Sequence, residues 1–137
     1  MAVAYPSVEE ILKRLGVFVP PKYVCASDIN VGDLVYLSGV NTVIKAKADS
    51  IDTMPVLGIV FVKYSPTSCN VAEEYVLKDV DPSLLPSDGD YYASTTEAGK
   101  YQSTTPTGSG VVIQKIGFKM DATTLRIAIN DNYIKRP

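Results

Sequence analysis

A short pattern that occurs twice is the feature of this sequence that most limits its fold. Gly32-Asp33-Leu34-Val35-Tyr36-Leu37 in the first half corresponds to Gly89-Asp90-Tyr91-Tyr92-Ala93-Ser94 in the second. A glycine interrupts an apolar run at a similar interval after each copy, Gly58 in the first half and Gly117 in the second. Glycine inside a strand marks a bulge or a close approach of two backbones. The repeat therefore predicts two related β halves that pack together.

Short runs with β-strand patterning fill the chain after residue 21. In 42–48, Ile44, Ala46 and Ala48 alternate with the other side chains and are expected on one face. Residues 55–62 are apolar on both faces, which predicts a central strand, and residues 71–78 have the pattern of one half-buried strand. Leu125 and Ile127 are expected to point inward from a last strand.

The length of the chain, 137 residues, favours a single domain. Eight or nine short strands separated by turn residues predict a mainly-β fold, a compact β-barrel or sandwich. We expect the β domain at 22–130, with halves at about 22–80 and 81–130. A polar tail is expected at 131–137, and an N-terminal arm at 1–21.

The arm contains the one clear helix signal, over about 7–15. Ser7 and Glu10 have the spacing of a capping box, in which each side chain bonds the backbone N–H of the other residue. The apolar side chains that follow at helical spacing are Val8, Ile11, Leu12 and Leu15. A helix this short is marginal in water, so it needs a surface to dock on. Two alternatives remain: the helix caps its own barrel, or it docks on a neighbouring subunit.

The sequence offers little for catalysis. It contains no histidine, the commonest general base and metal ligand. No glycine-rich phosphate-binding pattern precedes a helix, so no nucleotide cofactor is expected. The aspartates at 79–90 lack the glycine and the glutamate that a calcium-binding loop requires, so no metal site is expected either. We therefore predict that the protein is not an enzyme; a hydrolase that uses aspartates alone, such as Asp33 or Asp90, is the alternative.

Charge and hydropathy also limit the partners and the location. A net charge of −2 provides no basic field for direct nucleic-acid binding. No apolar run reaches the length of a membrane span, and the first residues lack the pattern of a signal peptide. Synthesis in a cytoplasm is therefore expected. Cys25 and Cys69 are interpreted as small buried side chains, with a single disulfide as the alternative.

Tyrosine is abundant, with nine in the chain. Tyrosine is enriched at protein interfaces because it combines a large contact area with a polar tip. Tyr5 and Tyr133 lie outside the expected strands and are the better interface candidates. Together with the apolar stripe of the arm they form the candidate contacts with a partner protein or another subunit: Tyr5, Val8, Ile11, Leu12, Leu15 and Tyr133.

The order of these blocks resembles a small β module of tailed-bacteriophage virion proteins. That module occurs in head decoration (capsid-cementing) proteins and within head- and tail-fibre proteins. The resemblance covers roughly 24–130. Besides the repeated blocks above, it rests on Lys45-Ala46-Lys47-Ala48-Asp49, Ala98-Gly99-Lys100-Tyr101, Thr105-Pro106 and Ile116-Gly117-Phe118.

The resemblance implies a structural protein of the virion that often forms homotrimers. Such trimers sit on the capsid surface and clamp neighbouring subunits of the major capsid protein. Because the module makes up almost the whole chain, a free-standing decoration protein is favoured. A tail-fibre, baseplate or receptor-binding module of a virion is the alternative.

Overall fold

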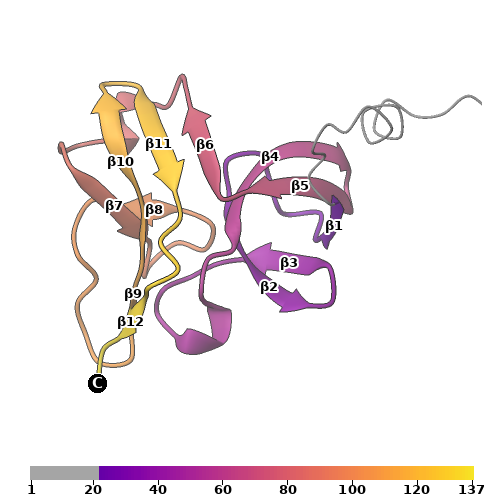
Figure 1. Ribbon diagram of the computed structural model, residues 1–137, viewed down its shortest axis with the longest axis horizontal. Helices are drawn as coiled ribbons and strands as arrows, with labels where there is room; N and C mark the ends of the chain where they lie inside the picture. The colour runs from indigo at the N-terminus through magenta and orange to yellow at the C-terminus, as the bar shows by residue number, and fades with distance from the viewer. Residues whose placement is uncertain (1–21) are drawn as a thin grey trace, which may run out of the picture.

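The computed structural model describes residues 22–137, and Figure 1 shows their strands as two β bodies side by side. The arm at 1–21, with its expected helix at 7–15, lies outside the described residues. The described part has twelve short strands in three sheets, and its helical segments are the single turns η1 (Ile51–Thr53) and η2 (Pro82–Leu84). The mainly-β prediction is confirmed, whereas the expected number of strands was too low.

The first body is a closed barrel with strand order β1-β3-β2-β4-β5. Its strands are β1 (Lys22–Cys25), β2 (Leu34–Gly39), β3 (Thr42–Lys45), β4 (Gly58–Ser65) and β5 (Ser68–Ala72). Strand β1 closes the barrel because it pairs on both sides, parallel to β3 through Val24 and Thr42 and antiparallel to β5 through Tyr23 and Cys69.

The second body is an open five-stranded sheet with order β6-β11-β10-β7-β8. Its strands are β6 (Glu74–Leu77), β7 (Asp90–Ala93), β8 (Tyr101–Gln102), β10 (Lys115–Asp121) and β11 (Thr124–Ala128). The third sheet pairs β9 (Val112–Ile113) with β12 (Ile134–Lys135). Residues 131–137, expected to form a polar tail, therefore include a paired strand.

The two bodies share one connectivity. The strands of the barrel can be matched in chain order with those of the second sheet: β1 to β5 with β6, β7, β8, β10 and β11. Matched strands then have matching neighbours along the two sheet orders. The bodies differ in closure, since β1 also pairs with β3, whereas the corresponding strands β6 and β8 lie at opposite edges of the open sheet. The repeated glycines lie in corresponding strands, Gly58 in β4 and Gly117 in β10.

Both glycines permit a close contact between neighbouring strands. A Cβ atom on Gly58 would lie 2.4 Å from the carbonyl oxygen of Ala72, and one on Gly117 would lie 2.0 Å from that of Arg126. These contacts are too short for any side chain, so the interruption of each apolar run by glycine has a direct steric cause.

Two hydrophobic cores hold the fold together. One fills the barrel and contains Val35 and Val60. The larger one lies between the barrel and the second sheet, and it includes Leu34 and Ile59 from the barrel together with Tyr91 from β7. Neighbouring residues of one strand thus serve different cores, because successive side chains point to opposite faces. A shared core makes the two bodies one packed unit.

The faces expected at 42–48 agree with the two cores, since Val43 belongs to the core inside the barrel whereas Ala46 and Ala48 belong to the larger core outside it. Ile44 pairs with Tyr36, which packs against that larger core, but Ile44 itself is 44% exposed. One strand prediction needs correction. The single strand expected at 71–78 is in fact the end of β5 followed by β6, which belong to different sheets.

The predicted last strand is confirmed at its centre. Leu125 and Ile127 of β11 are both fully buried in the larger core. Their alternation with half-buried neighbours follows the period of two that a strand imposes.

The two cysteines are free thiols inside the barrel. Burial raises the pKa of the Cys69 thiol to about 12, and a hydrogen bond with Cys25 acts in the same direction. In the unfolded chain this thiol ionises near its ordinary pKa of 9.0. The thiol therefore contributes stability that is fully present below pH 9 and is lost as the pH rises from 9 towards 12.

This shift predicts alkaline sensitivity that depends on Cys69. Between pH 8 and pH 10.5 the wild-type chain should lose more free energy of unfolding than Cys69→Ala, as measured by urea denaturation at both pH values. Equal losses in the two proteins would show that the Cys69 thiol is not held protonated by the fold.

Candidate functional site

A buried carboxylate joins the two bodies. Asp33, at the start of β2, is fully buried and accepts a hydrogen bond of 2.8 Å from the backbone N–H of Asn30. The Nζ atom of Lys100 lies 3.1 Å from its second carboxylate oxygen, and that of Lys45 lies 3.8 Å from the first. Since Lys100 follows Asp33 by 67 residues and precedes β8, this ion pair ties the second body to the first.

The corresponding aspartate of the second body is in a different environment. The side chain of Asp90 is 48% exposed and pairs with Lys115 at 3.0 Å. By sequence alone, Asp33 and Asp90 are equivalent candidates for the acidic residues on which a hydrolase would depend. The structure separates them by burial, and the oxygens of Asp33 are already engaged by an amide and two ammonium groups.

A second buried polar side chain, Gln114, was missed by the sequence analysis. It lies between β9 and β10, accepts a hydrogen bond of 2.7 Å from the N–H of Val56, and donates to the carbonyl oxygens of Val56 at 3.2 Å and Asn130 at 3.0 Å. In the sequence, Gln114 is marked only as an uncharged polar residue that, with Lys115, separates the apolar residues 111–113 from the apolar residue 116. It connects the loop before β4 to the second body.

Replacing Gln114 with leucine should lower the free energy of unfolding by about 3 kcal/mol, because it leaves the buried N–H and carbonyl groups of Val56 and the partly buried carbonyl group of Asn130 without their partner. Urea denaturation followed by circular dichroism measures the change. A loss smaller than about 0.5 kcal/mol would mean that these hydrogen bonds add nothing to stability beyond what water supplies.

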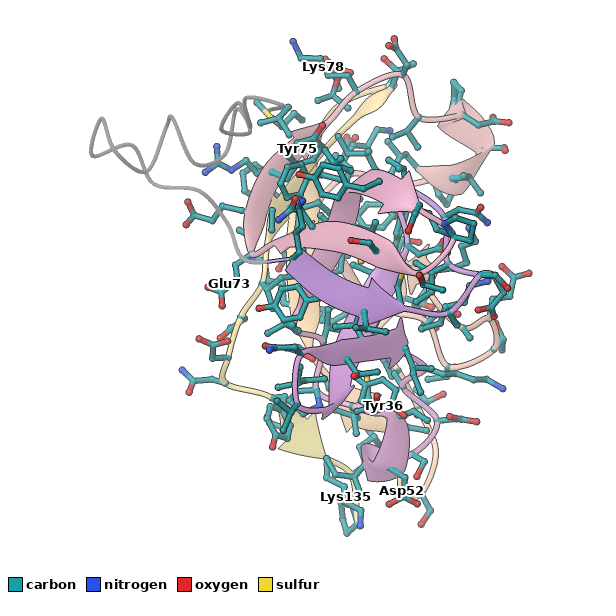
Figure 2. All side chains as sticks on the ribbon, turned by 90° about the vertical axis from the view of Figure 1, so that its right-hand side faces the viewer. Tyr36, Asp52, Glu73, Tyr75, Lys78 and Lys135 are labelled. Carbon is teal, nitrogen blue, oxygen red and sulfur yellow. The ribbon has the colours of Figure 1, made fainter. Side chains whose placement is uncertain are left out.

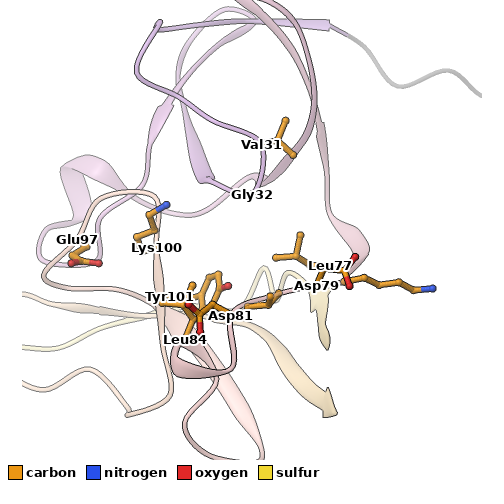
Figure 3. Close-up of a pocket in the computed structure, with 11 residues that line it drawn as sticks. Val31, Gly32, Leu77, Asp79, Asp81, Leu84, Glu97, Lys100 and Tyr101 are labelled. Carbon is orange, nitrogen blue, oxygen red and sulfur yellow. The ribbon is translucent and has the colours of Figure 1, made fainter. Parts of the chain in front are cut away.

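A pocket of about 340 Å³ lies at the junction of the two bodies, and Figure 3 shows its lining residues. Its lining combines apolar and charged side chains. They come from the loop before β2, from β6 and the segment after it, and from the β7–β8 connection and β8. The side chains are those of Val31, Leu77, Lys78, Asp79, Val80, Asp81, Leu84, Glu97, Lys100 and Tyr101. The volume is at the lower end of the range for small-molecule sites.

Two groups of the pocket have shifted pKa values. Burial raises the pKa of Tyr101, whose ring meets Tyr91 edge to face at a centroid distance of 6.1 Å. The backbone N–H of Ser83 donates to the carboxylate of Asp81 and lowers its pKa. At neutral pH the pocket therefore presents the neutral phenol of Tyr101 and the ionised carboxylate of Asp81. Its lining contains neither cysteine nor serine as a nucleophile.

Of the candidate contact residues, only Tyr133 belongs to the described part of the chain. Tyr133 is 40% exposed. It directly precedes Ile134 of β12, which is also exposed. The other five, Tyr5, Val8, Ile11, Leu12 and Leu15, lie outside the described residues.

Further apolar side chains are exposed on both bodies. Val24, Leu37, Val40 and Ile44 lie on the barrel, and Phe118 and Met120 lie on β10. Figure 2 views the molecule from the barrel side, with Tyr36 labelled on that face.

Within residues 22–137, no group of three or more aspartate, glutamate or cysteine side chains is arranged to hold a metal ion. The same residues include no helix with the length and apolar character needed to cross a membrane. No protein-family model, curated protein or solved structure matches this chain.

Proposed function

We propose that this chain is a structural protein of a bacteriophage virion. It binds the outer surface of the capsid as a homotrimer and cements neighbouring subunits of the major capsid protein against the pressure of the packaged DNA. The observation that carries the proposal is the duplicated construction of the β domain. The Gly-Asp block on which the resemblance rests directly precedes Leu34 of β2 in one half and includes the first residue of β7 in the other. The two halves are taken as copies of one module.

The packing of the two halves suits a protein that has to resist mechanical force. A core shared by the barrel and the second sheet, together with the Asp33–Lys100 ion pair, makes the domain one rigid unit. A rigid unit that contacts two capsid subunits resists their separation without deforming itself. A typical interface buries about 1,600 Å² in total, and a trimer repeats its contacts three times, so avidity is high even when each contact is modest.

Exposed apolar side chains outside the barrel are the described residues best suited to capsid contact. Phe118 and Met120 on β10 and Tyr133 and Ile134 near the C-terminus have exposed fractions of 40% or more. Large apolar and aromatic side chains supply most of the binding energy at protein interfaces. Tyr5, which is not part of the apolar stripe of the arm, remains a candidate from the sequence.

A second candidate function is a tail-fibre, baseplate or receptor-binding module. The junction pocket favours it, because a tyrosine ring beside carboxylates and ammonium groups is suited to a small polar ligand such as a sugar. In that case the protein would be found on tail components.

Sedimentation tests the proposal. The purified protein is centrifuged alone, with DNA-filled heads and with undecorated heads of the phage that encodes it. We expect a trimer that pellets with expanded shells at a fixed stoichiometry. Protein that stays in the supernatant with shells, and instead pellets with tail fractions, would refute the capsid role and support the second candidate.

A further inference from the structure

One outer wall of the barrel, across β1, β3 and β2, is apolar and exposed. Val24 pairs in register with Thr42, and Ile44 pairs with Tyr36. Since Thr42 and Ile44 are two residues apart, all four side chains project from the same outward face. Val24 is 53% exposed and Ile44 is 44% exposed. Val40, in the turn between β2 and β3, extends the apolar surface and is 91% exposed. We call this surface, which Figure 2 faces, the bare wall.

Another part of the barrel surface is covered. Leu34 of β2 and Ile59 of β4 also point out of the barrel, but both are fully buried against the second sheet. Residues 74–128 thus cover one wall of the barrel. On the other wall, several large apolar side chains are exposed in the described part of the chain. A contiguous exposed apolar patch marks a surface that binds something.

We propose that the bare wall is covered by residues 7–16 of the same chain. The described chain begins at Lys22, two residues before Val24, so the preceding 21 residues are attached on the wall itself. Residues 16–21 link the expected helix to β1. This link spans up to roughly 20 Å when extended, whereas three neighbouring strands are only about 10 Å wide. The link is long enough for the helix to fold back onto the wall.

The chemistry of the two surfaces agrees. Val8, Ile11, Leu12 and Leu15 recur at helical spacing, so the helix expected from the sequence would have one apolar face and one charged face. A helix of this length requires an apolar surface in order to persist. A short tether also holds it near the wall at an effective concentration in the millimolar range, which favours the chain's own wall over that of another molecule.

An arm on the bare wall is the first of the two alternatives left open by the sequence, in which the helix caps its own barrel. This arrangement concerns the isolated protein and does not depend on a role in a virion.

Hydroxyl-radical footprinting of the purified full chain tests the inference, because oxidation rates report the solvent exposure of side chains. We compare the wild type with Ile11→Asp, which places a charge in the stripe, and with Lys13→Asp, which places the same charge on the opposite face. Ile11→Asp should raise the oxidation of Val24 and Ile44 several-fold, whereas Lys13→Asp should leave it unchanged. Phe118 on β10 serves as a reference that no variant should alter.

The wall protection should also be constant over a hundredfold range of protein concentration. Equal oxidation of the wall in the wild type and in Ile11→Asp would overturn the proposal, because the wall would then be bare. Protection that disappears on dilution would overturn it too, since a neighbouring molecule would then supply the cover. If Ile11→Asp also raises the oxidation of Phe118, the domain has unfolded, and Leu15→Ser takes its place in the comparison.

Discussion

Gly117→Ala is expected to lower the free energy of unfolding by more than about 4 kcal/mol, or to prevent folding altogether. The new methyl group would lie 2.0 Å from the carbonyl oxygen of Arg126 and 3.2 Å from the Cα of Ile127. Both atoms belong to the backbone of the neighbouring strand, so no side-chain rotation relieves the overlap. Strands β10 and β11 would have to separate at the centre of the second sheet.

A matched substitution controls for the general effect of losing a glycine. Gly39→Ala, at the end of β2, introduces a methyl group with no atom within 4 Å. It should change the free energy of unfolding by less than about 0.5 kcal/mol. Urea denaturation followed by circular dichroism compares the two variants. Equal stability of Gly117→Ala and Gly39→Ala would disprove the close contact between β10 and β11.

Asp33→Ala is expected to lower the free energy of unfolding by about 3 kcal/mol, because breaking a buried ion pair leaves its partners uncompensated. The N–H of Asn30 loses its acceptor, and Lys45 and Lys100 lose their shared carboxylate. The estimate lies at the lower end for buried pairs because half of the Lys100 side chain is exposed and remains hydrated.

The corresponding residue of the second half supplies the control. Asp90→Ala removes an exposed ion pair with Lys115 and should cost less than about 1 kcal/mol. The same denaturation experiment measures both variants. Should the two substitutions destabilise the protein equally, the burial of Asp33 at the junction would have no energetic role.

Much of the β architecture could be predicted from local pattern. The repeated Gly-Asp blocks and the glycines Gly58 and Gly117 predicted two halves with strands in a similar order. The alternation of Leu125 and Ile127 located the inward face of β11. These features depend on neighbouring residues of one strand, and a period of two expresses them directly.

What the sequence could not predict depends on distant partners. Asp33 and Asp90 occur in the same local pattern, but only Asp33 is buried, because Lys100 and Gly99 of the second body pack against it. The passage from β5 to β6 leaves no break in the pattern of 71–78, because no glycine or proline separates the two strands. Gln114 has partners far away in the sequence, so its role is visible only once the chain is folded.

Heat-induced release of DNA from phage heads tests the cementing role most directly. Heads that carry this protein and heads that lack it are warmed under identical conditions, and the accessibility of DNA to an intercalating dye is followed with temperature. If the chain cements the capsid, decorated heads should retain their DNA to a higher temperature, and adding the purified protein to bare heads should restore the difference. Release at the same temperature from both kinds of head, with the protein bound to the shell, would contradict that role.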